Sequence, residues 1–238
     1  MFFASLIERR HLRPIEPLDD AKAPSSAKAL GVHQELIDCG MLFLGVYRDG
    51  ESNILKTEMS IYLSPDGRVM AMLPRHAYTL GYRVYSEFAD GRLLVSGQVT
   101  GNGSVSGLRD QAMLPDCSVR QVLRFHLDRL SNYSQEAVPF SPETITDDLL
   151  ARDRQEAEAS VQQGLARWVD ARQTIWVMTL AGAWRVAWGQ LADFARLTRD
   201  NARAEEYKAE GDPRLDWEIE DEDAEVVALI DEFDEGPT

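Results

Sequence analysis

The feature that most constrains the fold is a series of five short apolar runs between residues 41 and 100. One of them, "TEMSIYL", alternates strictly, with Met59, Ile61 and Leu63 on one side, which is the pattern of a β-strand. Asp-Gly pairs stand between these runs or at their start, and this pair favours the tight turns of β-hairpins. We therefore predict an antiparallel β-meander of five to six strands whose apolar face needs a cover.

Amphipathic segments after the meander are predicted to supply that cover. The segment "SVRQVLRFHLDRL" opens with Ser118 and has Gln121 three residues later, which is a capping box at a helix start. A second helix is predicted to begin at Ser141, with Pro142 in its first turn, and to continue to about Trp168. The predicted fold class is therefore α+β, with long C-terminal amphipathic helices over an antiparallel sheet.

Residues 174–195, "TIWVMTLAGAWRVAWGQLADFA", raise the question of a membrane span because they hold three tryptophans and only two charges. Arg185 near the centre would cost about 2.5–3.5 kcal/mol in a bilayer, about as much as the apolar residues return. Apolar residues recur with helical period from Leu180, and the residues before it are β-branched or aromatic. We predict a buried strand followed by a long helix on the sheet, with the tryptophans in the core.

Charge divides the chain into parts. The net charge is −15, and residues 211–238 contain twelve acidic residues and one arginine, a net charge of −11, which leaves −4 for residues 1–210. We expect an N-terminal arm and linker (1–26), a single α+β domain (27–210) and a flexible acidic tail (211–238). Apolar residues within the tail predict an amphipathic docking segment. They are Trp217, Val226, Leu229, Ile230 and Phe233.

Several classes of function find no support in the sequence. An acidic chain lacks the basic face that nucleic-acid binding needs. Cys39 and Cys117 match neither a disulfide framework nor a zinc site, so we expect two reduced thiols in the cytoplasm. We predict no metal and no cofactor, since the histidines are isolated and the glycine-rich stretch 96–107 fits a turn better than a phosphate loop. The N-terminal "MFFASLIERRHLRP" lacks the order of a secretion signal.

No catalytic residues are predicted either. Cys117 and His126 could form a thiolate–imidazolium pair, but along one helix they would be about 13 Å apart. Nearby, Arg120, Arg124 and Arg129 make the helix at 118–130 the most basic in the chain. These arginines could receive an anionic ligand, a lipid headgroup or the acidic tail of the chain itself.

Three functional hypotheses follow. The first is a non-catalytic interaction or sensor domain whose acidic tail docks in a basic or apolar groove of a protein partner, or mediates self-association. The second is a small-molecule-binding protein or enzyme with a pocket between the curved sheet and the Trp-rich helix. The third is a domain held at a membrane through its N-terminus, through the Trp-rich helix or through both, a contact that the acidity of the chain disfavours. The candidate ligand-binding residues are Tyr62, Tyr82, Tyr85, Trp176, Arg120 and Arg124.

Overall fold

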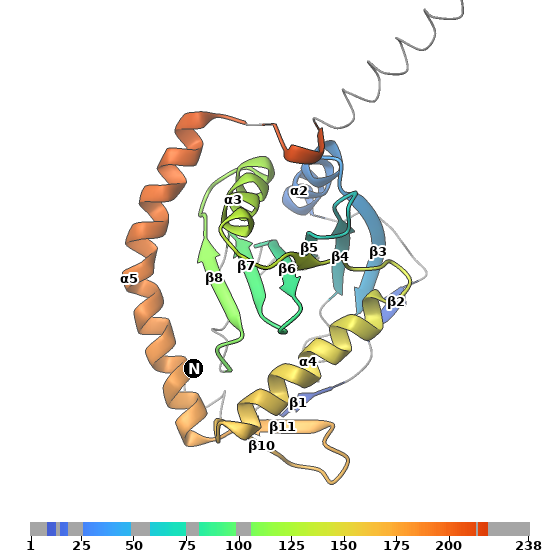
Figure 1. Ribbon diagram of the computed structural model, residues 1–238, viewed down its shortest axis with the longest axis vertical. Helices are drawn as coiled ribbons and strands as arrows, with labels where there is room; N and C mark the ends of the chain where they lie inside the picture. Colours follow the sequence, from blue (N-terminus) through green and yellow to red (C-terminus); the bar gives the residue numbers. More distant parts are fainter. Residues whose placement is uncertain are drawn as a thin grey trace, which may run out of the picture.

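The computed structural model describes residues 9–12, 15–18, 26–48, 58–74, 81–98, 106–212 and 214–218. Within them the protein is mixed α+β with a mostly antiparallel sheet, which confirms the predicted class (Figure 1). The strands are β1 (Arg10–His11), β2 (Glu16–Leu18), β3 (Leu42–Arg48), β4 (Glu58–Leu63), β5 (Met70–Pro74), β6 (Arg83–Phe88), β7 (Leu93–Gly97), β8 (Arg109–Met113), β9 (Ala137–Val138), β10 (Ala166–Trp168) and β11 (Ile175–Met178). The helices are α2 (Ala27–Asp38), α3 (Val119–Ser131), α4 (Ile145–Gln162) and α5 (Leu180–Glu210).

The main sheet has the order β2-β3-β4-β5-β6-β7-β8, and β9 pairs with β6. All neighbours are antiparallel except β7 and β8, which are parallel. The strands β3 to β7 follow one another in sequence order, as in a meander. Between β4 and β5 the Asp66 carboxylate accepts hydrogen bonds from the Ser64 hydroxyl and the Arg68 N–H. Gly67 has a φ of +72°, and a Cβ there would come within 2.7 Å of the Phe140 carbonyl oxygen.

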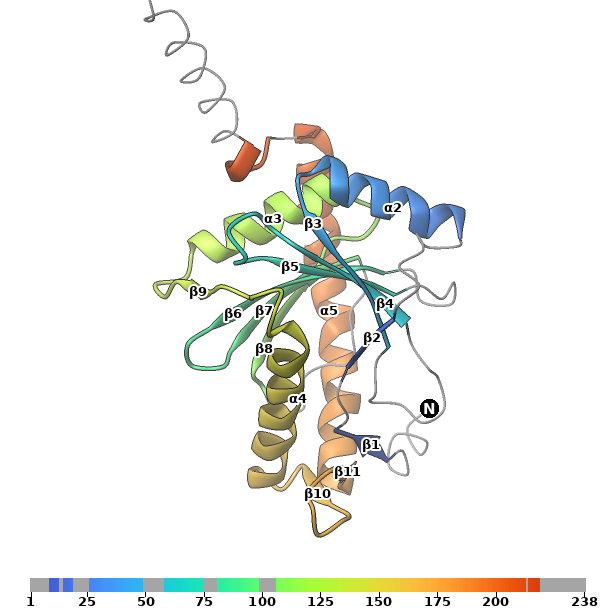
Figure 2. The ribbon, with the colours of Figure 1, turned by 90° about the vertical axis from the view of Figure 1, so that its right-hand side faces the viewer.

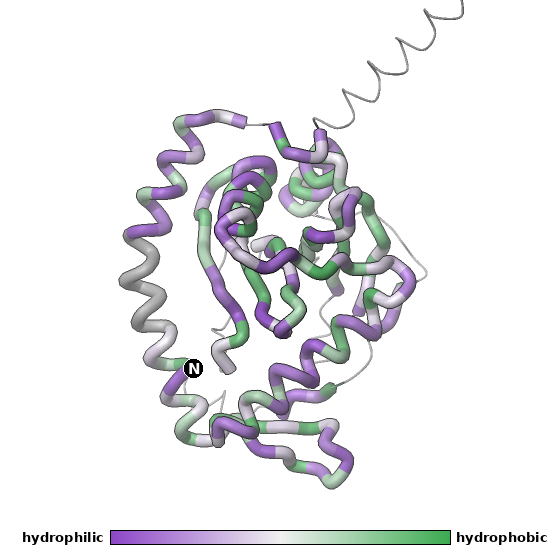
Figure 3. Tube along the Cα trace, in the orientation of Figure 1, coloured by the Kyte–Doolittle hydropathy of each residue, from purple (hydrophilic) through white to green (hydrophobic). Residues whose placement is uncertain are grey.

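Helices cover both faces of this sheet (Figure 2). Met59, Ile61 and Leu63 lie together on one face, as their alternation predicts, and pack in a cluster that includes Ile145 and Leu149 of α4. The other face packs against α2 and α3 through a larger cluster. Figure 3 shows strands of the main sheet as largely hydrophobic stretches of the chain, whereas α4 is mostly hydrophilic. Burial on both faces leaves little room for a further covering helix.

Local signals explain where the helices begin and end. The Ser118–Gln121 capping box at the start of α3 is confirmed. The predicted start of α4 was three or four residues early. The helix begins at Ile145, and the residue before it, Thr144, makes no side-chain cap. The predicted end was too late, because Gly164 has a φ of +70° and the following residues pair with β11 instead of continuing the helix.

A second, three-stranded sheet has the order β1-β11-β10 and lies beside the start of α5 (Figure 1). The strand predicted upstream of Leu180 is confirmed as β11, and Thr179 caps α5 by accepting a hydrogen bond from the Gly182 N–H. The predicted arm and linker therefore contribute β1 to this sheet and β2 to the main one.

Helix α5 lies along the β8 edge of the main sheet instead of over its face (Figures 1 and 2). Its 31 residues correspond to about 46 Å of helix. Trp184 and Trp188 are 59% and 57% exposed, so the prediction that these tryptophans lie in the core was wrong, whereas Trp176 on β11 is buried. The physical reason is that α2, α3 and α4 already occupy both faces of the sheet. No helix in the described ranges is long and apolar enough to cross a bilayer.

Candidate functional site

The first described part of the acidic tail contacts the body of the protein. Leu215 is fully buried, and Trp217 packs at the edge of the core while its indole N–H donates to the Cys39 carbonyl at 2.8 Å. Asp212 accepts a hydrogen bond from the Ser118 hydroxyl at 2.8 Å, and the Gly211 carbonyl accepts one from the Gln121 amide. We call residues 211–212 and 214–218 the docked segment. It lies beside α2 and the start of α3 (Figure 1).

Two of the three arginines singled out in the sequence bind this segment, whereas the third, Arg129, pairs with Asp110. Arg120 donates to Glu218 through Nη1 at 2.5 Å, and Arg124 donates to Asp216 at 2.9 Å. Burial alone would raise the pKa of Glu218, but hydrogen bonds from Arg120 and the Leu215 N–H outweigh it, so this pKa is lowered. The chain's own tail, one of the anions considered for these arginines, thus contacts both of them.

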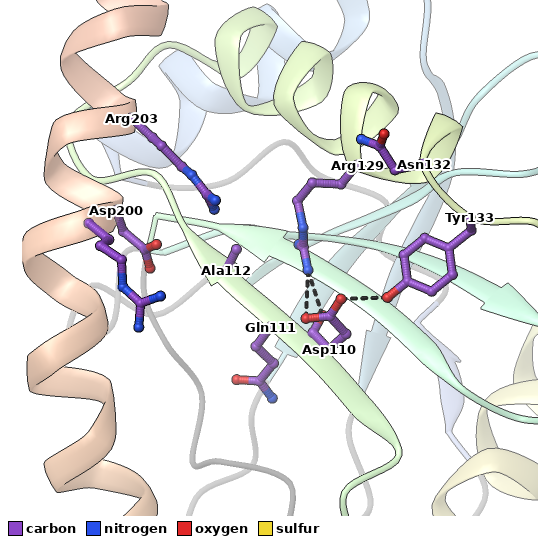
Figure 4. Close-up of a pocket in the computed structure, with 9 residues that line it drawn as sticks. Asp110, Gln111, Ala112, Arg129, Asn132, Tyr133, Asp200 and Arg203 are labelled. Atoms are coloured by element: carbon purple, nitrogen blue, oxygen red, sulfur yellow. Dashed lines mark hydrogen bonds and ion pairs between the residues drawn. The ribbon is translucent and has the colours of Figure 1, made fainter.

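A cavity of about 390 Å³ lies between β8, α3 and α5 (Figure 4). Its position between the sheet and the C-terminal helix corresponds to the second functional hypothesis, but none of the six predicted ligand-binding residues lines it. The lining is strongly polar and comes from three separate parts of the chain. The lining residues are Asp110, Gln111, Ala112, Arg129, Asn132, Tyr133, Arg199, Asp200 and Arg203.

One wall of the cavity is a fixed polar cluster around Arg129. Its guanidinium donates to the Val95 carbonyl at 2.6 Å and the Ser96 hydroxyl at 2.9 Å, and it pairs with the Asp110 carboxylate at 3.0 Å. Tyr133 donates its hydroxyl to the same carboxylate. Burial, followed by this hydrogen bond, raises the pKa of Tyr133 to about 12, so the phenol stays protonated at neutral pH. Arg129 is therefore a structural cation.

The opposite wall is formed by α5 (Figure 4). Asp200 is buried, and its carboxylate accepts the Met113 N–H at 3.2 Å, which ties α5 to the end of β8. Arg199 and Arg203, one helical turn apart, border the cavity, and within the described part of the chain neither forms an ion pair. These two side chains are the available cations of the cavity. Nothing in the sequence indicated these two arginines as a site, because the other residues that line the cavity are distant from them in sequence.

His126 lies behind the Arg129 cluster, fully buried between two strands and α3. Its Nε2 is 3.0 Å from the Ser86 hydroxyl and its Nδ1 is 3.0 Å from the Ser96 hydroxyl. Because Ser86 donates its proton to the Arg68 carbonyl, it accepts from Nε2, and Nδ1 in turn accepts from Ser96. Burial, and then the nearby Arg129 charge, lower the pKa of His126 to about 3. The ring is therefore neutral and holds the helix to the sheet.

The four predicted aromatic ligands do not form one pocket. Tyr62 and Tyr82 are fully buried on the α2–α3 side, where the Tyr62 hydroxyl is 2.7 Å from His33 Nδ1 and Tyr82 donates to the Ser118 carbonyl. Tyr85 packs on the opposite, α4-facing side of the sheet. Trp176 belongs to the cluster of the small sheet. Of the tail residues, Trp217 is described, whereas Val226, Leu229, Ile230 and Phe233 lie outside the described residues.

The cysteines do not form the nucleophilic pair considered above. Burial raises the pKa of Cys39 to about 11, and it also raises the pKa of Cys117. Cys117 contacts the Ala204 carbonyl, whereas His126 bonds to the two serines. Both thiols therefore stay protonated at neutral pH. Among the described residues no group of three acidic, histidine or cysteine side chains could hold a metal ion.

Comparisons with known proteins connect this arrangement to none of them. No protein family, no curated protein and no solved structure matches the chain.

Proposed function

We propose that this protein is a non-catalytic interaction domain whose acidic C-terminal tail binds a partner protein with a basic or apolar groove. The observation that carries the proposal is the docked segment. Leu215 and Trp217 pack on the core cluster that α2 and α3 share with the sheet, so the described part of the tail is held in place up to residue 218. A rigid attachment lowers the entropy that the tail loses when it binds a partner.

Charge supports the same function. Glu218 and Asp216 pair with Arg120 and Arg124, the cations of α3 nearest to them. Residues 219–238 add nine further acidic residues and no basic one, together with the apolar Val226, Leu229, Ile230 and Phe233. Such a segment matches a groove that is basic at its rim and apolar at its floor. Such a partner would carry the charge that complements these acids.

The test compares three versions of the full protein as bait in extracts of its own cells. The second version ends at residue 218, and the third keeps all tail acids but replaces Val226, Leu229, Ile230 and Phe233 by serine. We expect a captured protein that is lost with both variants and that binds less at high salt. Equal capture by the version ending at residue 218 would contradict the proposal. Equal capture by the serine variant would show that charge alone attracts the partner.

A second candidate function is the binding of a small anion in the cavity, and Arg199 and Arg203 are the observation that favours it. Guanidinium groups one turn apart suit a carboxylate or phosphate group, and the fixed Arg129–Asp110 pair would orient the rest of the ligand. The test is a thermal-shift series with inorganic phosphate and citrate on the wild type and on R199Q/R203Q. A shift of the wild type that is lost in this variant supports the function, and identical behaviour of both proteins contradicts it.

A further inference from the structure

The start of α5 and the small sheet beside it combine exposed apolar side chains with arginines. Leu180, Trp184 and Trp188 lie four residues apart on one side of α5 and are 73%, 59% and 57% exposed. The Trp184 and Trp188 rings pack edge to face, 6.0 Å apart. Large apolar side chains that stay exposed in a contiguous row mark interaction surfaces.

The charge of this region is opposite to that of the whole protein. Residues 9–12 and 163–189, which make up the small sheet, its hairpin and the first turns of α5, contain five arginines and one aspartate. The aspartate, Asp170, is used inside the hairpin, where it accepts hydrogen bonds from the Thr174 and Ile175 N–H groups. In contrast, Arg167, Arg172 and Arg185 are exposed. The region is therefore a basic patch on a chain of net charge −15.

Two described acidic residues near this patch are already paired with arginines outside it. On the adjoining half of α4, Glu156 pairs with Arg109 of β8, and Glu158 pairs with Arg154 at 3.0 Å. Within the described part of the chain, Arg167, Arg172 and Arg185 form no ion pair. We call Leu180, Trp184 and Trp188, together with these three arginines, the basal surface. Its positive charge is thus available to an external anionic surface.

We propose that the basal surface binds the headgroup region of a membrane that contains anionic lipids. Tryptophan is the side chain best suited to the boundary between headgroups and acyl chains, because its ring is apolar and its N–H is polar. Arginines beside it are attracted by the negative potential of anionic lipids. A surface that combines both, at the start of α5 and on the small sheet beside it, has the composition of a peripheral membrane contact.

The distribution of charge along the molecule favours a membrane over an acidic protein segment as the occupant. The docked segment, and with it the start of the acidic tail, lies at the end of the molecule opposite the small sheet (Figures 1 and 2). An anionic bilayer would attract the basal surface and repel the tail end, which orients the protein with its tail away from the lipid. The inference does not depend on the function proposed for the tail.

The experiment measures co-sedimentation of the full chain with vesicles of phosphatidylcholine, with and without phosphatidylglycerol. We expect binding to the mixed vesicles, little binding to phosphatidylcholine alone, and weaker binding at high salt. The variant R167Q/R172Q should bind about thirtyfold more weakly, since each arginine near the surface contributes about a factor of five. The variant W184S/W188S should lose at least about tenfold, because its apolar contact is removed.

Matched controls remove the same groups elsewhere. R68Q/R92Q deletes two half-exposed arginines outside the basal surface, and L30S/L42S deletes two exposed apolar side chains of α2 and β3. Both should bind like the wild type, and thermal melting confirms that each variant is folded. Absence of wild-type binding to the mixed vesicles would overturn the proposal. An equal loss of vesicle binding in the control and test variants would also overturn it. The same holds if the protein binds a peptide of residues 219–238 through Trp184 but does not bind vesicles.

Discussion

Helices α3 and α5 carry apolar stripes of the same helical period, yet they bury them to opposite extents. On α3, Val122 and Leu123 are fully buried against the main sheet, whereas Trp184 and Trp188 of α5 are more than half exposed. The difference lies in what each helix faces. Helix α3 packs on β6 and β7, while the first turns of α5 meet the end of β11 and the rest of its described contacts are with the β8 edge and α3. An amphipathic pattern thus predicts a helix and its apolar side, but not which surface that side meets.

The largest expected effect is the difference in stability loss between a substitution in the apolar stripe of α3 and one in the apolar stripe of α5. Leu123→Ala should lower the free energy of unfolding by about 2–5 kcal/mol, because it leaves a cavity in a fully buried site. Trp184→Ala should change it by only about 0.5 kcal/mol, since the ring is mostly in solvent. Urea unfolding of both variants measures the two values. Equal losses of unfolding free energy would show that the Trp184 ring is packed. The two helices would then not differ in how far they bury their apolar stripes.

Two glycines of α5 sharpen the comparison within that helix. A Cβ at Gly182 would lie 1.9 Å from the Leu165 carbonyl oxygen, whereas one at Gly189 meets nothing within 4 Å. Gly182→Ala should therefore destabilise the protein by about 1–3 kcal/mol. Gly189→Ala should stabilise it by about 0.5–1 kcal/mol, as expected for an open helical position. Thermal unfolding of the two variants gives the sign of each effect, and a stabilising Gly182→Ala would show that α5 does not approach Leu165 in this way.

The buried face of α3 should also make stability depend on pH. The pKa of His126 is lowered to about 3 in the folded protein from an ordinary value of 6.5. Between these values the unfolded chain binds the extra proton, so stability is complete above the higher value and falls as the pH decreases towards the lower one. From pH 7 to pH 5 the loss is about 2 kcal/mol.

The control for this titration is His126→Gln, which keeps a donor towards Ser86 but cannot titrate. It should unfold more easily at neutral pH and show a flatter dependence of the free energy of unfolding on pH above about pH 5. Urea unfolding at a series of pH values measures the slope. An unchanged slope in the variant would mean that His126 is not the group responsible.

The smallest effect is expected at the docked segment. Asp216→Ala removes the ion pair with Arg124, but the Asp216 side chain is 68% exposed. Screening by solvent limits the loss to less than about 1 kcal/mol. Urea unfolding should therefore barely distinguish this variant from the wild type. A loss as large as that of Leu123→Ala would indicate that the docked segment is held by charge instead of by Leu215 and Trp217.

Local patterns in the sequence predict much of this fold. The alternation around Ile61, the Asp-Gly turns and the Ser118 capping box depend on neighbouring residues only, and the structure has strands, turns and a helix start at those places. The Asp49-Gly50 pair and residues 99–105 of the glycine-rich stretch lie outside the described residues. Strand β8, "RDQAM", carries no alternating apolar signal, so its parallel pairing with β7 could not be predicted.

The candidate sites depend on contacts between distant parts of the chain, which a single sequence does not encode visibly. The cavity joins Asp110 to Arg199, and the docked segment joins Arg120 to Glu218. The predicted pocket residues Tyr62 and Tyr82 are instead core residues, because both sheet faces are covered. Their aromatic character indicated burial correctly but could not distinguish a core from a binding pocket.

The central claim is that both faces of the main sheet are closed while α5 leaves Trp184 and Trp188 in solvent. The most direct measurement is acrylamide quenching of tryptophan fluorescence in the wild type and in W184F/W188F, both as the full chain. The account predicts that the wild type has an easily quenched component, with an emission maximum close to that of tryptophan in water, and that the variant lacks it. An easily quenched component of unchanged size in the variant would contradict the claim.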